Sequence, residues 1–450
     1  MCLGVWLHAA DALVATTVMP SAIEEIGGLS YIYWTIALYE LGSIIAGAVT
    51  GVGVVALGLR TSMMAAALAY ALGCVASALA PSMAAMLAGR LVQGLGGGAM
   101  LALSYVGVSQ LFPEHLWTRV LAIVSGVWGV SSLVGPLVGG VFAAAGLWRG
   151  AFWAFAVQAV LLILLTPSLV GPHRAPPAAA GSAVPGPQIA ALTAGVVVIS
   201  YAGVQTDVVA MGALAAVGLA ILALVLRLER RAPARLFPPA PLGLRTQWAA
   251  GYTMVLALAT ATVSYTVYGP LLMTRLFGVS PLTAGFMIAT ESVAWTLAAL
   301  AFARATPAQE PLLIRTGAFL VAVGIVALAV AMPRGPVLAL LPGGLLQGAG
   351  FGMCWAFVLR RIVAGVAADE RERASAAMPT FQMIGYAVGA AASGIVANAL
   401  GLTETAPDAV ARVVAFWVFA AFLPLAALGV VGAFRTAQNP SGSQHPAGST

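Results

Sequence analysis

The sequence predicts an all-α integral membrane protein, and three observations lead to this prediction. Hydrophobic residues make up 61% of the 450 residues and charged residues only 8%, which leaves too few charges to cover a soluble protein of this size. The charges stand in short clusters between apolar runs long enough to cross a bilayer, which takes about 17–25 residues. Because backbone groups in lipid must be hydrogen-bonded within their own segment, we expect these runs to be helices.

The apolar runs define fourteen candidate spans. The two spans within 188–228 can be removed together without disturbing the others, so twelve spans remain an alternative. In chain order the candidates lie near 2–22, 31–56, 62–80, 83–111, 119–145, 150–170, 188–204, 208–228, 247–274, 282–303, 312–331, 336–363, 374–400 and 410–434.

The spans divide into two bundles of six with a helix pair inserted between them. Pro, Gly and Ala enrich the first break between these units, and arginine enriches the second. The expected organisation is an N-terminal bundle over 1–170, a cytoplasmic linker over 171–187, the inserted pair over 188–228, a second cytoplasmic linker over 229–246, a C-terminal bundle over 247–434 and a disordered tail over 435–450.

A gapless internal repeat supports two related halves. Moving along the chain by 254 positions superimposes a glutamine, an arginine and several glycines on identical residues. The inside or outside sense of the spans is the same in both copies, which predicts a pseudo-twofold axis along the membrane normal. The matching residues are Gln93, Gly94, Gly96 and Gly98 with Gln347, Gly348, Gly350 and Gly352, followed by Arg119 with Arg373, Gly135 with Gly389 and Gly140 with Gly394.

All twenty basic residues are arginine, and their positions predict the topology. With both termini in the cytoplasm, only Arg149, Arg275, Arg334 and Arg412 fall in outer breaks, Arg90 lies within a span, and the other fifteen are inside. This is the asymmetry of the positive-inside rule. We therefore expect a multi-pass protein of the cell inner membrane. The arginines are not gathered on one face with aromatics, so we do not expect nucleic-acid binding.

Patterns typical of catalysis, metal binding and ATP hydrolysis are missing from the sequence. Cys2, Cys74 and Cys354 lie far apart within apolar runs, which predicts neither a disulfide framework nor a metal site. No Ser/His/Asp or Cys/His arrangement occurs, and no phosphate-binding P-loop. We expect no enzymatic activity, no cofactor and no metal, and the oligomeric state is left open.

Three motifs stand in order on the first, fourth and fifth spans. With them the chain resembles the major facilitator superfamily, most closely its fourteen-span drug:proton antiporter branch. The resemblance implies two pseudo-symmetric six-helix bundles around a central cavity and proton-coupled export by alternating access. The first motif is Asp11 to Pro20 (DALVATTVMP) and the second is Arg90 to Gly94 (RLVQG). The third has two parts, Gly126 to Gly129 (GVWG) and Gly135 to Gly140 (GPLVGG).

A fourth motif, in the loop after the second span, is incomplete. Gly51, Gly58 and Arg60 remain, but Val55 stands where the resemblance implies an aspartate and Leu59 where it implies a basic residue. In the family this loop is similar to a latch that favours the outward-facing state. Its loss keeps open a second reading, a non-transporting membrane sensor or assembly partner.

Three carboxylic acids stand within the spans: Asp11, Glu40 and Glu291. Each lies about ten residues from the end of its span, roughly 15 Å deep at 1.5 Å per residue. Such groups are costly in lipid unless they face a cavity or a partner. We expect them to carry protons, although the resemblance supports only Asp11. The alternative is a structural role in hydrogen bonds between helices.

Arg90 keeps its charge in the membrane and therefore needs an anion or backbone carbonyls. The resemblance implies a part in proton coupling, and the alternative is a structural clamp with Gln93. The candidates for lining a substrate cavity are Gln93, Trp128, Tyr265 and Gln347.

The fifth span carries a stripe of small residues that allows close helix approach. The functional reading is that this span packs against the other half and prevents proton leak, and tight packing alone is the alternative. The residues are Gly126, Gly129, Gly135, Gly139 and Gly140, with Pro136 adding a kink.

The sequence thus predicts a proton-coupled exporter of small lipophilic compounds. Acids in the spans favour cationic substrates, and a neutral or anionic metabolite is the alternative. The expected partners are the lipid bilayer, the small-molecule substrate and protons.

Overall fold

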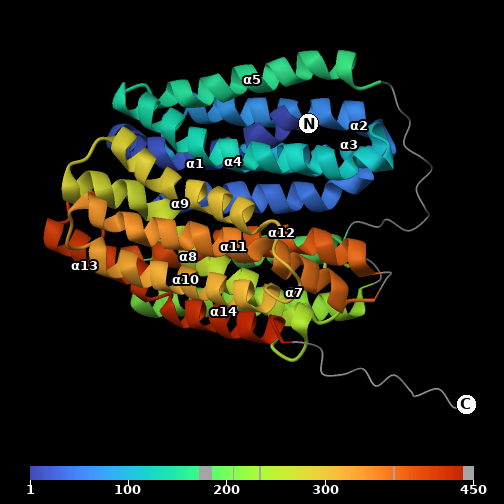
Figure 1. Ribbon diagram of the computed structural model, residues 1–450. Helices are drawn as coiled ribbons and strands as arrows, with labels where there is room; N and C mark the ends of the chain where they lie inside the picture. Colours follow the sequence, from blue (N-terminus) through green and yellow to red (C-terminus); the bar gives the residue numbers. More distant parts are fainter. Residues whose placement is uncertain (172–184, 206, 233–234, 368–369, 439–450) are drawn as a thin grey trace, which may run out of the picture.

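The computed structural model describes the whole chain except residues 172–184, 206, 233–234, 368–369 and 439–450. The described residues form helices and no strands. Figure 1 shows two groups of roughly aligned helices, α1–α5 in blue to teal and α8–α14 in yellow-green to red. The first part of the chain forms α1 (Cys2–Ile26), η1 (Leu29–Tyr31), α2 (Trp34–Ala78), α3 (Met83–Leu111), α4 (Glu114–Ala144), α5 (Trp148–Leu169), α6 (Gly186–Ala202) and α7 (Val208–Arg231).

The second part of the chain repeats this pattern of long apolar helices. It forms α8 (Gln247–Phe277), α9 (Pro281–Phe302), α10 (Glu310–Ala331), η2 (Val337–Leu340), α11 (Leu341–Gly365), α12 (Arg371–Ala399), α13 (Asp408–Ala420) and α14 (Leu423–Thr436).

Within the described residues, thirteen segments are long and apolar enough to cross a membrane, and α6 adds a shorter apolar helix of 17 residues. The segment Asp408–Thr436 crosses as one span although α13 and α14 are separate. Pro424 near the start of α14 accounts for the interruption, because proline cannot donate the backbone hydrogen bond of a continuous helix. The observed spans agree with the fold class that the sequence predicts.

Helix α2 contains two spans that run in opposite directions. Its helical geometry is broken at Gly58, whose φ of 77° and ψ of 160° suit glycine alone among the common residues. The contacts with α3 establish the reversal. Before Gly58, residues later in α2 meet residues later in α3, so the two helices are parallel; after Gly58 the order is reversed, so they are antiparallel. Tyr39 meets Gly94 and Ser43 meets Gly98, whereas Tyr70 meets Gly96 and Ser77 meets Gly89.

The internal repeat is visible as the same close helix approach in both halves. A Cβ atom on Gly94 would overlap the carbonyl oxygen of Tyr39, and one on Gly348 would overlap that of Glu291. Gly98 and Gly352, one turn later, meet backbone atoms in the same way. The glycines of the repeat therefore let α3 pack directly on α2 and let α11 pack directly on α9.

The inserted pair, α6 and α7, lies beside the two bundles. A Cβ on Gly195 of α6 would come within 3.2 Å of the Gly218 carbonyl oxygen of α7, so the two helices are in close contact. Helix α6 packs against α2 and α12, and the Tyr33 hydroxyl donates to the Ser200 carbonyl at 2.7 Å. Only 17% of the central stretch of α7 is buried, against 83% for α8. Helix α7 is thus peripheral and α8 central.

The two bundles are joined on the side that the arginine positions assign to the outside. The Glu404 carboxylate accepts a hydrogen bond from the backbone N–H of Gly28 at 3.0 Å. The Asn398 amide donates to the Ser30 carbonyl at 3.0 Å and to the Gly203 carbonyl at 2.7 Å. These contacts connect the outer ends of α1, α6 and α12.

The close approach at Gly348 can be tested by adding one methyl group. Gly348→Ala places a Cβ against the α9 backbone, and we expect this overpacking to lower the free energy of unfolding by about 1–3 kcal/mol. The matched control is Gly212→Ala on exposed α7, where a Cβ meets nothing within 4 Å. Thermal unfolding in detergent measures both. Equal midpoints for the two variants would contradict the described packing.

Candidate functional site

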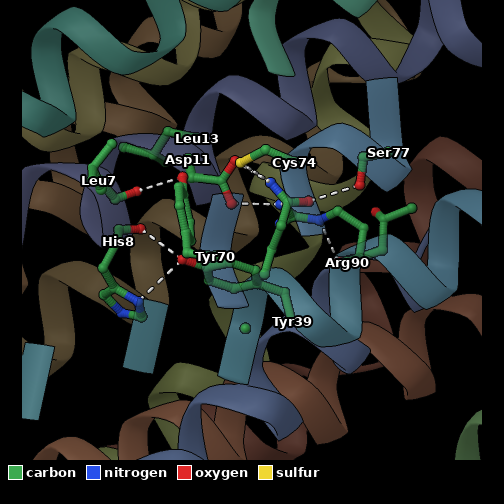
Figure 2. Close-up of polar contacts among 12 residues, drawn as sticks. Leu7, His8, Asp11, Leu13, Tyr39, Tyr70, Cys74, Ser77 and Arg90 are labelled. Carbon is green, nitrogen blue, oxygen red and sulfur yellow. Dashed lines mark hydrogen bonds and ion pairs between the residues drawn. The ribbon is translucent and has the colours of Figure 1, made fainter. Parts of the chain in front are cut away.

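A buried ion pair joins α1 to α3. A terminal guanidinium nitrogen (NH1) of Arg90 lies 2.5 Å from Oδ2 of Asp11, and the two side chains are 0% and 1% exposed. Figure 2 shows the two groups facing each other among side chains of α1, α2 and α3. Removing one charge of such a pair costs about 3–5 kcal/mol, because the other is left buried without compensation. The pair thus ties α1 to α3.

Gln93 forms hydrogen bonds with both members of the pair. Its Nε2 donates to Oδ1 of Asp11 at 3.2 Å, and its Oε1 accepts from Arg90 at 3.3 Å and from the Ser77 hydroxyl at 2.9 Å. Arg90 also donates through Nε to the Thr35 carbonyl at 3.2 Å. Both halves of α2 therefore contribute to this network, which the sequence motifs did not indicate. Gln93, a candidate for the substrate cavity, is fully buried within it.

Aromatic side chains enclose the ion pair. The guanidinium of Arg90 stands over the ring of Tyr39, 4.3 Å from its centroid, a favourable arrangement for a desolvated cation. The Tyr39 hydroxyl lies 3.1 Å from Nδ1 of His8, and the Tyr70 hydroxyl donates to the Leu7 carbonyl at 3.0 Å. Both tyrosines are themselves fully buried, so the network lies in the interior of the bundle.

The α2 members of this network carry a weak sequence signal. Tyr70, Cys74 and Ser77 are spaced four and three residues apart, which places them on one face of a helix. The Cys74 sulfur accepts from Gln93 at 3.2 Å. A stripe of polar groups in an otherwise apolar span could have indicated a buried partner, although it does not identify Asp11 as that partner.

Glu40 and Glu291 lie outside this network, one in each half of the chain. Glu40 of α2 is 7% exposed, and its Oε2 has no hydrogen-bond partner among the described residues. Glu291 of α9 is partly exposed. The Tyr386 hydroxyl of α12 accepts a hydrogen bond from Gln382 at 2.9 Å.

The remaining cavity candidates are dispersed. Trp128 of α4 packs edge-on against the His8 ring, with centroids 5.8 Å apart. The buried Tyr265 hydroxyl donates to the Met287 carbonyl at 2.9 Å. Gln347, the repeat counterpart of Gln93, is fully buried, and neither amide atom has a partner within the described part of the chain.

The small residues of α4 contact two helices. On one side, Cβ atoms on Gly135 and Gly139 would meet the α1 backbone. On the other side, Gly140 faces Leu282 of α9, and the Pro136 carbonyl faces Gly285. Gly129 faces Thr296, whereas Gly126 has nothing within 4 Å. Helix α4 is thus held between α1 of its own half and α9 of the other.

The incomplete loop motif surrounds the reversal at Gly58. Leu59 is 2% exposed and Arg60 is partly exposed. Gly51 and Val55 belong to the helical backbone before the reversal, and their surroundings lie outside the described residues.

Comparison with known proteins agrees with this architecture. The Major Facilitator Superfamily description matches residues 1–188. The chain is 31% identical over 446 residues to a probable multidrug-efflux transporter of Mycobacterium tuberculosis, covering 96% of this chain and 92% of that one.

Solved structures extend the similarity to the fold of the whole chain. A peptide transporter structure gives a TM-score of 0.70 at 14% identity, covering 97% of this chain and 93% of that chain. A D-xylose–proton symporter gives a TM-score of 0.68 at 17% identity, covering 97% and 95%. With a curated relative similar over nearly its full length, the chain is a multi-pass membrane protein that belongs to the major facilitator superfamily.

Proposed function

We propose that the protein exports small lipophilic compounds, cations foremost, across the cell inner membrane in exchange for protons. The Asp11–Arg90 ion pair is the observation that carries this proposal. In it the carboxyl group of Asp11, which can bind a proton, is buried where three helices meet. The printed name of the Mycobacterium tuberculosis relative, a probable multidrug-efflux transporter, supports the export of more than one compound.

Protonation of Asp11 couples proton binding to helix movement. The neutral acid no longer compensates Arg90, and an uncompensated guanidinium in a medium of low dielectric constant is costly. The described arrangement is therefore stable only with Asp11 ionised, and a proton is accepted in a conformation where Arg90 gains another partner. A proton that binds the two conformations unequally shifts the equilibrium between them.

The contacts between the bundles fit alternating access. Hydrogen bonds of Glu404 and Asn398 join the halves at the predicted outer side, and α4 packs directly on α9 of the other half. We propose that the bundles at 1–170 and 247–434 rock against each other. Asp11 takes up a proton while the outer side is open, and release of that proton to the cytoplasm restores the described arrangement, in which the outer contacts are closed. In this proposal both termini lie in the cytoplasm, which is the orientation that the arginine positions predict.

Two acids without ionic partners support a preference for cations. Neither Glu40 nor Glu291 forms an ion pair with a described residue. Trp295, one turn after Glu291, stacks with Phe351 at 5.0 Å between ring centroids and lies 5.6 Å from the Trp355 ring. A carboxylate beside aromatic faces suits a lipophilic cation.

Proton coupling is tested by removing both charges of the ion pair together. Asp11→Asn with Arg90→Gln leaves no uncompensated buried charge, so we expect a folded protein. In proteoliposomes with an imposed pH gradient, uphill movement of a lipophilic cation such as ethidium should fall at least about tenfold, while downhill movement persists. The control is Asp408→Asn, an exposed acid on α13, which should behave as wild type. Undiminished uphill movement in the double variant would remove the proposed role.

Charge selectivity is tested at the two unpaired acids. Glu40→Gln and Glu291→Gln should each reduce movement of cationic compounds several-fold while sparing neutral lipophilic ones, because only a cation uses the carboxylate charge. A panel of matched cationic and neutral dyes in the same vesicles measures this ratio. Equal losses for both classes would favour the neutral or anionic substrate alternative, and no movement of any compound by wild type would favour the sensor.

A further inference from the structure

A groove of about 320 Å³ opens on the surface of the C-terminal half, away from the Asp11–Arg90 pair. It lies between the end of α10 and the beginning of α13, at the predicted outer side. The residues lining it are Pro333, Arg334, Arg412, Val413, Phe416 and Trp417.

Two arginines border the groove and are held side by side. Arg334 donates from NH1 to the Val330 carbonyl at 2.7 Å, and Arg412 donates from NH1 to the Pro333 carbonyl at 2.6 Å. Both side chains are exposed, and within the described ranges neither forms an ion pair, even with Asp408 one turn before Arg412. Most of their N–H groups therefore remain available to an anion.

The other two arginines on this side have structural partners. Arg149 forms an ion pair with Glu25. Arg275 donates to the carbonyls of Thr403 and Ala406. Arginine is uncommon in outer loops, and Arg334 and Arg412 stand together at one groove without an ion pair among the described residues, which suits the groove to an anionic occupant.

On the predicted topology, the groove runs from the outer end of α13 toward the interior of the membrane. Helix α13 begins at Asp408, so Arg412 lies about 6 Å along it at 1.5 Å per residue. Val413 and Trp417 continue down the same face, each 47% exposed. A charged upper end above an apolar wall matches a molecule with a phosphate at one end and an acyl chain at the other.

We propose that this groove binds an anionic phospholipid of the outer leaflet. The phosphate accepts hydrogen bonds from Arg334 and Arg412, whose guanidinium groups suit bidentate contacts with phosphate oxygens. The acyl chain lies along Val413, Phe416 and Trp417, with the indole at the membrane interface where tryptophan is favoured. The site differs from the proposed transport site in location and in charge.

Native mass spectrometry of the purified protein with added phosphatidylglycerol or phosphatidylcholine tests the proposal. We expect wild type to retain phosphatidylglycerol preferentially. The double variant Arg334→Gln/Arg412→Gln should bind it at least about tenfold more weakly, a loss of about 1.4 kcal/mol or more. The double variant Arg334→Lys/Arg412→Lys keeps the charges but not the bidentate guanidinium geometry, and it should lose only part of the affinity. It replaces the glutamine variant in this test if that variant does not fold.

The matched control is Arg304→Gln, which removes an exposed arginine outside the groove and should leave the affinity unchanged. An equal loss in this control would show unspecific charge attraction and overturn the proposal. If inorganic phosphate displaced phosphatidylglycerol at concentrations similar to those of the lipid, the site would be assigned to a free anion instead. A change of oligomeric state in the glutamine variant, with lipid binding intact, would make the groove a contact between two copies.

Discussion

Charge compensation inside the bilayer is the constraint on which the rest of the structure depends. Arg90 keeps its charge at any physiological pH, and Asp11 on another helix provides the compensating charge at 2.5 Å. Gln93 bridges the two, the Thr35 carbonyl accepts a hydrogen bond from Arg90, and the Ser77 hydroxyl donates to Gln93. The packing of α1, α2 and α3 and the protonation of one carboxyl group therefore cannot change independently.

The two halves share their packing but not their chemistry. Gly94 and Gly348 allow the same backbone contact, whereas Gly344 occupies the repeat position of Arg90 and lies 3.3 Å, measured from an added Cβ, from the Tyr265 ring. The counterpart of Gln93 in the second half, Gln347, accordingly has no described partner. Duplication has kept the glycines that set helix distances, whereas the Asp11–Arg90 pair is not repeated, because Tyr265 and Gly344 stand at the corresponding positions of the second half.

Composition and hydropathy were sufficient to predict the spans, because the requirement for internal backbone hydrogen bonding in lipid leaves little choice of structure. The motifs also indicated Asp11 and Arg90 separately. Their pairing across 79 positions depends on how α1 packs on α3, which no local pattern encodes. The groove beside α13 was missed because Arg334 and Arg412 served only as topology markers in the sequence.

The most direct test follows the proton itself. Substrate added to the purified transporter in weakly buffered detergent solution, with a pH indicator, should release a proton from wild type as the substrate-bound state returns Asp11 to its ion pair. The variant lacking both charges of the pair should release none while still binding substrate. Proton release of equal size from both proteins would show that the exchanged proton resides elsewhere and would contradict the role assigned to the Asp11–Arg90 pair.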